Sequence, residues 1–135
     1  MNVEYINDNQ IHLIKDNIKY ILTFKILNQT QIIIKAQQQE NKNILIPYVY
    51  ERILNIDDLP KREGIEIKNM ETFLKGIIYS SKNNKLHFNL TQQYLNLSYD
   101  ILYEEYQINI PRAYTNECNQ LSSTLSENAY YLIKN

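Results

Sequence analysis

The stretch that decides the fold is Ile18–Ile26, which reads Ile-Lys-Tyr-Ile-Leu-Thr-Phe-Lys-Ile. Every even-numbered position in it is apolar, whereas Lys19 and Lys25 occupy the opposite face. This period of two, carried by β-branched and aromatic side chains, predicts a half-buried β-strand. The dipeptide Asn28-Gln29 then predicts a tight turn, and residues 30–36 predict the returning strand of a hairpin.

The same alternation recurs on both sides of this hairpin. It predicts five further strands, at residues 11–15, 44–50, 85–90, 94–101 and 104–110. Pro47 lacks a ladder donor, so the strand that contains it is expected at a sheet edge or a bulge, and Pro111 is expected to close the last strand. The sequence therefore predicts about seven strands, four before the middle of the chain and three after it.

The apolar period changes between these two blocks. Apolar residues with the spacing of an amphipathic helix are Met70, Phe73, Leu74, Ile77 and Ile78. Asn69 is placed to cap this helix at its N-terminus. Residues 57–64, which begin with two aspartates and a proline and end at Gly64, predict a short helix before it. The centre of the chain is thus expected to be a helix–turn–helix.

Helical spacing returns near the end of the chain. Leu121, Leu125, Ala129 and Leu132 predict an amphipathic helix over residues 120–134, after a linker at 113–119. We therefore expect a β-rich globular domain at 1–112, followed at 113–135 by the linker and helix. The predicted fold class is α+β, mainly β: an antiparallel β-sandwich or barrel with an inserted helix–turn–helix and a C-terminal helix.

Composition points to the interior of the cell. The net charge is −1, without the basic excess that general phosphate binding requires. The single cysteine cannot form an intramolecular disulfide, which favours a reducing compartment. Glu4 and Asp8 lie where a signal peptide would have a basic start and an apolar run, and no apolar run approaches the ~18 residues that span a bilayer. We expect an intracellular, cytoplasmic protein that does not contact membranes.

The residues that could carry catalysis are too scattered to form a recognisable site. His12 and His87 lie in separate predicted strands and Cys118 lies in the polar linker, so their spacing matches neither a zinc site nor an activated nucleophile. Gly64 and Gly76 are the only glycines, too few for a phosphate-binding loop. We expect no metal, no cofactor and no enzymatic activity.

The acidic pairs have structural explanations. The adjacent residues Glu104 and Glu105 point to opposite faces of a strand and cannot share a site. Asp57 and Asp58 suit the start of the short predicted helix better than a metal site.

Tyrosine is the unusual residue, with 12 copies and no tryptophan. Tyr20, Tyr99 and Tyr106 fall on apolar strand faces and are expected in the core. The residues that we expect to bind a partner are Tyr48, Tyr50, Tyr94 and Tyr103, together with Leu121, Leu125 and Leu132 of the predicted C-terminal helix. Exposed tyrosines suit protein interfaces because they bury a large area at a small cost in side-chain entropy.

The segment Ile56–Leu90, IDDLPKREGIEIKNMETFLKGIIYSSKNNKLHFNL, combines two short helices with a following strand. With the strands around it, over residues 11–112, this order resembles the head domains of the centriolar cartwheel and end-joining scaffold superfamily. The resemblance implies a seven-stranded β-sandwich with a helical pair between the fourth and fifth strands. It also implies self-association and scaffolding, without catalytic residues.

Three functions follow as hypotheses. The first is a non-enzymatic protein–protein interaction or scaffolding subunit of a larger intracellular assembly, for which composition and resemblance suggest a cytoskeletal or ciliary setting. The second is a nucleic-acid-binding β-barrel module. Its basic face would comprise Lys19, Lys25, Lys35, Lys61, Arg62 and Arg112. The third is an enzyme with an unrecognised site, which a deep pocket holding a perturbed histidine or carboxylate would support.

Overall fold

A computed structural model describes residues 2–39, 46–59, 67–101 and 104–113 of the chain. The elements in these ranges are β1 (Asn2–Asn7), β2 (Gln10–Lys15), β3 (Ile18–Asn28), β4 (Gln31–Gln38), β5 (Val49–Asn55), the 3₁₀ turn η1 (Ile56–Asp58), α1 (Met70–Lys82), β6 (Leu86–Leu90), β7 (Tyr94–Ile101) and β8 (Glu104–Ala113). The chain is mainly antiparallel β with one α-helix in the described residues, which confirms the coarse fold class.

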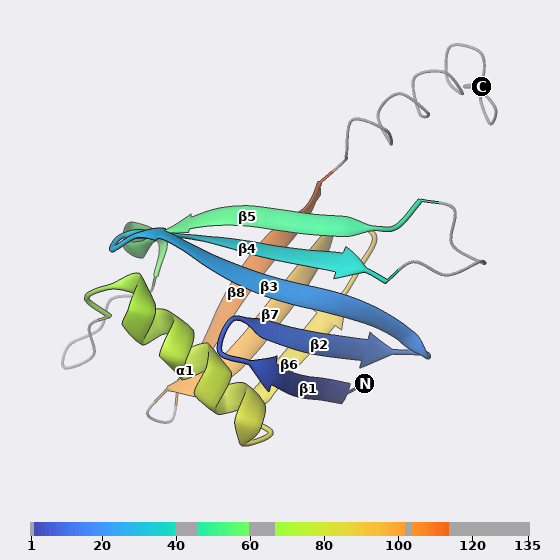
Figure 1. Cartoon of the computed structure of the whole chain (residues 1–135), viewed down its shortest axis with the longest axis horizontal. Helices are drawn as coiled ribbons and strands as arrows, with labels where there is room; N and C mark the ends of the chain where they lie inside the picture. The colour runs from blue at the N-terminus through green and yellow to red at the C-terminus, as the bar shows by residue number, and fades with distance from the viewer. Residues whose placement is uncertain (1, 40–45, 60–66, 102–103, 114–135) are drawn as a thin grey trace, which may run out of the picture.

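The eight strands form a single sheet in the order β1-β2-β3-β4-β5-β8-β7-β6. Each neighbouring pair is antiparallel, and the sheet curls into a nearly closed barrel. In Figure 1, β1–β5 form the front layer and β6–β8 cross behind them, with α1 along one end. The two strands that remain at the edges of the sheet are β1 and β6.

Local chemistry explains the turns of the front layer. Asp16 and Asn17 join β2 to β3 with φ of 53° and 64°, the left-handed pair that a two-residue type I′ hairpin requires. Asn28 Oδ1 accepts hydrogen bonds from the backbone and the hydroxyl of Thr30, both at 2.9 Å. The hairpin of β3 and β4 is therefore confirmed, with its turn shifted by one residue from the predicted dipeptide.

The helix α1 is also confirmed. Asn69 caps it, since its side chain accepts a hydrogen bond from Thr72 N at 2.9 Å. The Met70 N–H donates to Gln29 O in the β3–β4 turn, which fixes where the helix begins against the sheet. α1 contacts β1, β3, β6 and β7. Its buried face joins the apolar side chains of both layers in one core that includes Phe73.

Two predictions about strands are wrong. The described residues form eight strands and not seven, because β1 was not predicted: it is an exposed edge strand with little contrast between its two faces. β5 begins at Val49, after Pro47, and runs five residues beyond the predicted end at Tyr50. The apolar–polar pattern does not predict this part of β5, because the apolar Ile53 is 51% exposed whereas the charged Arg52 is half-buried.

The predicted helix–turn–helix lies only partly within the described residues. The described part of its first half is the single 3₁₀ turn η1, and Asp58 does act at its start, where Oδ2 accepts from Asn55 N at 3.0 Å. The insertion follows the fifth strand and not the fourth, because β1 adds one strand to the count. The predicted C-terminal helix, residues 120–134, lies outside the described residues.

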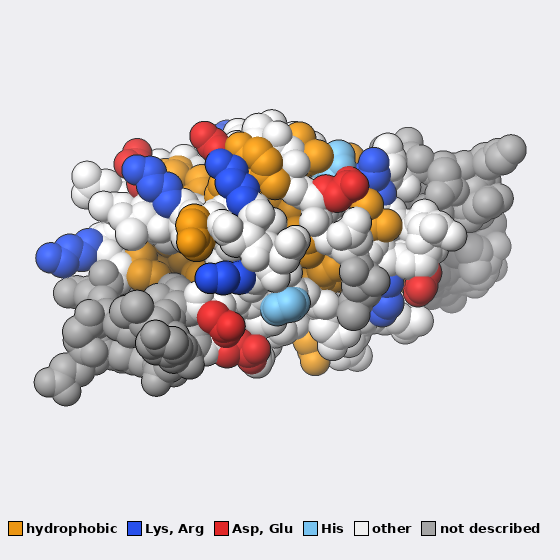
Figure 2. Space-filling model, turned by 90° about the horizontal axis from the view of Figure 1, so that it is seen from below, with side chains coloured by type: hydrophobic (Ala, Val, Ile, Leu, Met, Phe, Trp, Pro, Cys, Tyr) orange, Lys and Arg blue, Asp and Glu red, His pale blue; other side chains and the backbone are white. Residues whose placement is uncertain are grey.

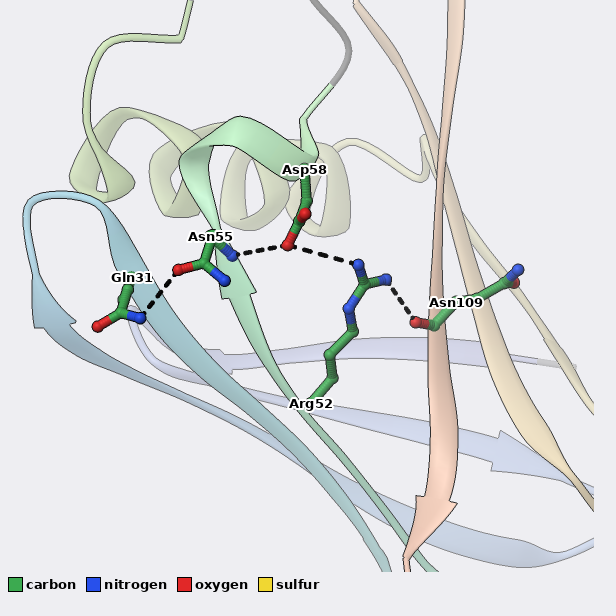
Figure 3. A network of polar contacts seen from close by, with 5 residues as sticks. All are labelled: Gln31, Arg52, Asn55, Asp58 and Asn109. Carbon is green, nitrogen blue, oxygen red and sulfur yellow. Dashed lines mark hydrogen bonds and ion pairs between the residues drawn. The ribbon is translucent and has the colours of Figure 1, made fainter.

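The front and back layers meet at β5 and β8, where the ladder contains only two residue pairs, Val49↔Ala113 and Tyr50↔Arg112. Beyond them, Arg52 Nη1 donates to Asn109 O at 2.9 Å. Figure 3 shows this guanidinium between β8 and η1, with its other nitrogen 3.6 Å from Asp58 Oδ2. An arginine side chain thus continues the junction where strand pairing stops.

Candidate functional site

A groove opens between α1, the end of β3 and the turn after β1. It is lined by Asp8, Ile26, Glu71, Leu74, Lys75, Ile78, Tyr79 and Lys82, and we call it the α1 groove. Its volume is about 310 Å³. Ile26, Leu74 and Ile78 supply apolar surface, and Tyr79, which is 59% exposed, adds an aromatic ring. These side chains form an apolar depression that opens to solvent.

Charged side chains of both signs surround this depression. Glu71 lies in the first turn of α1 and Lys82 in the last. Asp8 Oδ1 accepts a hydrogen bond from the Tyr5 hydroxyl at 3.0 Å, and Lys82 Nζ lies 4.5 Å from the centroid of the same ring. Together with Lys75, the groove therefore holds two carboxylates and two ammonium groups, with no excess of either sign.

The surroundings of the groove are also mixed. Figure 2 shows the side of the molecule on which α1 and β1 lie, where apolar side chains are separated by basic and acidic ones. Exposed apolar side chains on β1 and β3 include Tyr5, Ile6 and Leu27. Lys85 Nζ lies 5.9 Å from the centroid of the Tyr79 ring, so the exposed aromatic has a cation beside it.

The prediction that Tyr50 belongs to a surface cluster is wrong. Its side chain is 1% exposed, and its hydroxyl donates to Thr91 O at 2.8 Å. Burial raises the pKa of Tyr50 to about 12, and the neighbouring Tyr20 ring adds to the shift. Tyr50 points inward because even-numbered residues of β5, including Leu54, face the core.

Tyr48 and Tyr94 lie at the end of the sheet where β5, β7 and β8 meet. The Arg112 guanidinium carbon lies 3.8 Å from the centroid of the Tyr48 ring, which is partly buried against the core. Tyr94 is 39% exposed and pairs with Pro111. Of the predicted tyrosines in the described residues, Tyr94 therefore offers the most open surface.

The other predicted partner-binding residues fall outside the described ranges. They are Tyr103, Leu121, Leu125 and Leu132. In contrast, the α1 groove was not predicted, although the spacing of Leu74 and Ile78 marked them as an apolar helix face. Only the packing of α1 reveals that Leu74 lies beside open solvent and next to Ile26 of another element.

The residues considered for chemistry remain apart. His12 is partly buried on β2, with Nε2 3.3 Å from Gln10 Nε2, and His87 is exposed on β6. Burial lowers the pKa of His12, and the positive charge of Lys19 lowers it further. Glu105 accepts a hydrogen bond from Gln107 at 2.7 Å. Among the described residues, no group of three or more His, Cys, Asp and Glu could hold a metal ion.

The lysines proposed for a basic face are interrupted by other side chains. Lys35 on β4 pairs with Glu51 on one side and Thr23 on the other, and Lys25 pairs with Ile33. Lys61 and Arg62 lie outside the described ranges, as does Cys118. In the described part of the chain, no helix is long and apolar enough to cross a membrane.

Comparisons of the chain with models of protein families, with curated proteins and with solved structures found no match. Function is therefore inferred from the residues and geometry of this chain.

Proposed function

We propose that this protein is a non-enzymatic subunit of a larger intracellular assembly, and that it binds another protein through the α1 groove. The observation that supports this most is the open apolar depression beside Leu74 and Tyr79. Exposed apolar surface rimmed by polar groups is typical of interaction sites, because its burial stabilises a complex. Cytoskeletal and ciliary assemblies are the settings suggested by the resemblance to cartwheel heads.

The chemistry of the groove favours a protein as its ligand. An apolar centre with an aromatic residue and a charged rim has the anatomy of a protein interface. The balance between Glu71 and Lys75, and between Asp8 and Lys82, gives no preference for a polyanion such as a nucleic acid. An apolar side chain of the partner would fill the depression, and its charged groups would meet the rim.

The test compares two exposed tyrosines, one inside the α1 groove and one outside it. Tyr79→Glu places a charge in the groove, whereas Tyr94→Glu places the same charge on β7, outside it. Both residues are exposed, so both variants should keep the melting temperature of the wild type. Affinity capture from the native cell, with each captured protein then purified and titrated, measures binding.

Binding that is lost with Tyr79→Glu and kept with Tyr94→Glu supports the proposal. The opposite result would move the site to Tyr94 and contradict a role for the groove. If both variants keep binding, the groove is not the binding site, and the predicted C-terminal helix is tested next. Its contribution is measured by ending the chain after Ala113, which preserves the Val49↔Ala113 pair that holds β8 to β5.

A further inference from the structure

The edge strand β6 has a row of backbone groups that the sheet leaves unpaired. Thr91 N donates to Tyr94 O at the turn between β6 and β7, which fixes the phase of the antiparallel ladder. Because hydrogen-bonded pairs alternate along such a ladder, His87 and Asn89 direct their N–H and C=O groups toward β7. The N–H and C=O groups of Leu86, Phe88 and Leu90 therefore point away from the sheet, toward the free edge.

The two edges of the sheet are protected differently. β1 carries Glu4 and has a register shift between Tyr5 and Asn7, and charges and bulges are features that discourage edge pairing. β6 reads Leu-His-Phe-Asn-Leu and contains no Lys, Arg, Asp, Glu or Pro. Figure 1 shows β6 as the outermost strand of the layer behind. Within the described residues, β6 is thus the edge strand with fewer features that discourage pairing.

The sequence of β6 is complementary to itself when read in the opposite direction. If two copies meet with Phe88 on a two-fold axis, Phe88 faces Phe88 and Leu86 faces Leu90, apolar against apolar on the inner face. His87 then faces Asn89 on the outer face, polar against polar. The residues with outward-pointing backbone groups also face one another, which gives about six hydrogen bonds, two for each facing pair.

We propose that β6 is a self-association edge, which pairs antiparallel with β6 of a second copy around an axis at Phe88. A two-fold contact requires the same surface on both partners, and this strand, whose apolar–polar pattern is the same in both directions, meets that requirement without placing like charges opposite each other. The edge is separate from the α1 groove, since no groove residue belongs to β6. Binding at the groove and pairing at the edge therefore succeed or fail independently.

A cavity lies beside this edge. It has a volume of about 200 Å³ and lies between the two sheet edges, lined by Asn2 and Val3 of β1 and by Leu86, His87 and Phe88 of β6, with Asn84 before β6.

The test introduces charges that face each other across the dimer only if the two strands pair in this register. In the double variant His87→Lys with Asn89→Lys, each introduced lysine faces a lysine of the other copy. In the variant His87→Lys with Asn89→Glu, each faces a residue of opposite charge. His87 and Asn89 are both exposed, so the fold should tolerate either change, and unchanged melting curves check this.

Sedimentation equilibrium of the full chain from micromolar to millimolar concentration measures the dimer. We expect the wild type to dimerise, the like-charge variant to dissociate about tenfold more readily, and the opposite-charge variant to recover or exceed wild-type affinity. A wild type that stays monomeric at millimolar concentration overturns the proposal. Dimerisation that is equal in the two double variants also overturns it, because the contact would then lie elsewhere.

Discussion

The junctions β3–β4 and β5–β8 join neighbouring strands of one sheet in different ways. β3 and β4 pair from Tyr20↔Gln38 to Asn28↔Gln31, and backbone hydrogen bonds run along most of that length. β5 and β8 pair only at Tyr50↔Arg112 and one neighbouring position. The first junction is built by the backbone, whereas the second depends on side chains.

Pro111 explains why the β5–β8 ladder stops. Arg112 N donates to the carbonyl of Gln93, the residue before β7, so by alternation Pro111 and Asn109 are the β8 residues whose backbone groups face β5. Proline has no N–H to donate there, and pairing ends. The next carbonyl, that of Asn109, accepts the hydrogen bond from Arg52 instead (Figure 3). Where the chain removes a ladder hydrogen bond, a long cationic side chain satisfies the following acceptor.

The largest expected effect concerns the core that both junctions enclose. Phe73 is 1% exposed and meets the Tyr99 ring edge-on, with centroids 6.5 Å apart, so it packs α1 against the back layer. Phe73→Ala should lower the free energy of unfolding by about 3–5 kcal/mol. Chemical denaturation measures this. A loss below about 1 kcal/mol would mean that the core contributes less to holding the layers than their junction does.

The next prediction tests the β5–β8 junction directly. Arg52→Met keeps the apolar stem but removes the bond to Asn109 and the ion pair with Asp58. The expected loss is about 0.5–1 kcal/mol, because the hydrogen bond to Asn109 O is exposed and the ion pair is partly exposed, so water replaces much of what is lost. The control in the backbone-built junction is Thr23→Ala, which removes only a 3.4 Å contact to Lys35 O and should cost less than about 0.5 kcal/mol. Equal losses of unfolding free energy in the two variants would contradict the claim that the β5–β8 junction depends more on side chains than the β3–β4 junction does.

A third prediction concerns polar groups that no neighbour satisfies. Tyr99 and Tyr106 face each other across β7 and β8, and their buried hydroxyls have no hydrogen-bond partner in the described part of the chain. Burial, and then the neighbouring Tyr106, raises the pKa of Tyr99. Tyr99→Phe should therefore leave stability unchanged or raise it by up to about 1 kcal/mol. A fall of more than 1 kcal/mol in thermal or chemical unfolding would show that the hydroxyl has a partner.

The smallest expected effect is a pH dependence in the front layer. The pKa of His12 lies below its unfolded value of 6.5, so the unfolded chain binds more protons at slightly acidic pH. The contribution of His12 is fully present above 6.5 and is lost as the pH falls through the lower folded pKa. Unfolding free energies measured from about pH 7.5 to about pH 5.5 should fall less steeply in His12→Asn than in the wild type. Identical slopes would contradict the shift.

Strong periodicity made the central elements predictable from sequence. The alternation around Tyr20 and Phe24 and the helical spacing around Phe73 each match one burial face, so β3, β4 and α1 lie close to where they were expected. β1 was not predicted because an edge strand that is exposed on both faces does not need one apolar face and one polar face. The bounds predicted for β5 were wrong because Arg52 faces Asn109 and Ile53 faces solvent. Only the neighbouring strand explains this arrangement.

The candidate site was less predictable for the same reason. The direction of Tyr50 depends on which face of β5 meets the core, and sequence alternation identifies two faces without saying which is buried. The α1 groove depends on how Leu74 of the helix meets Ile26 of the sheet. Such a depression arises from packing between elements distant in sequence, and no local pattern encodes it.

The strand order also implies a sequence of events in folding. Every ladder except β5–β8 joins strands that are consecutive in the chain, so each layer can form from nearby segments. The junction with β8 instead brings together Arg52 and Asn109, 57 positions apart, and its loop-closure entropy opposes early formation. We therefore expect the two layers to form first and the β5–β8 junction to close late. In stopped-flow experiments Arg52→Met should accordingly speed unfolding and leave the folding rate nearly unchanged.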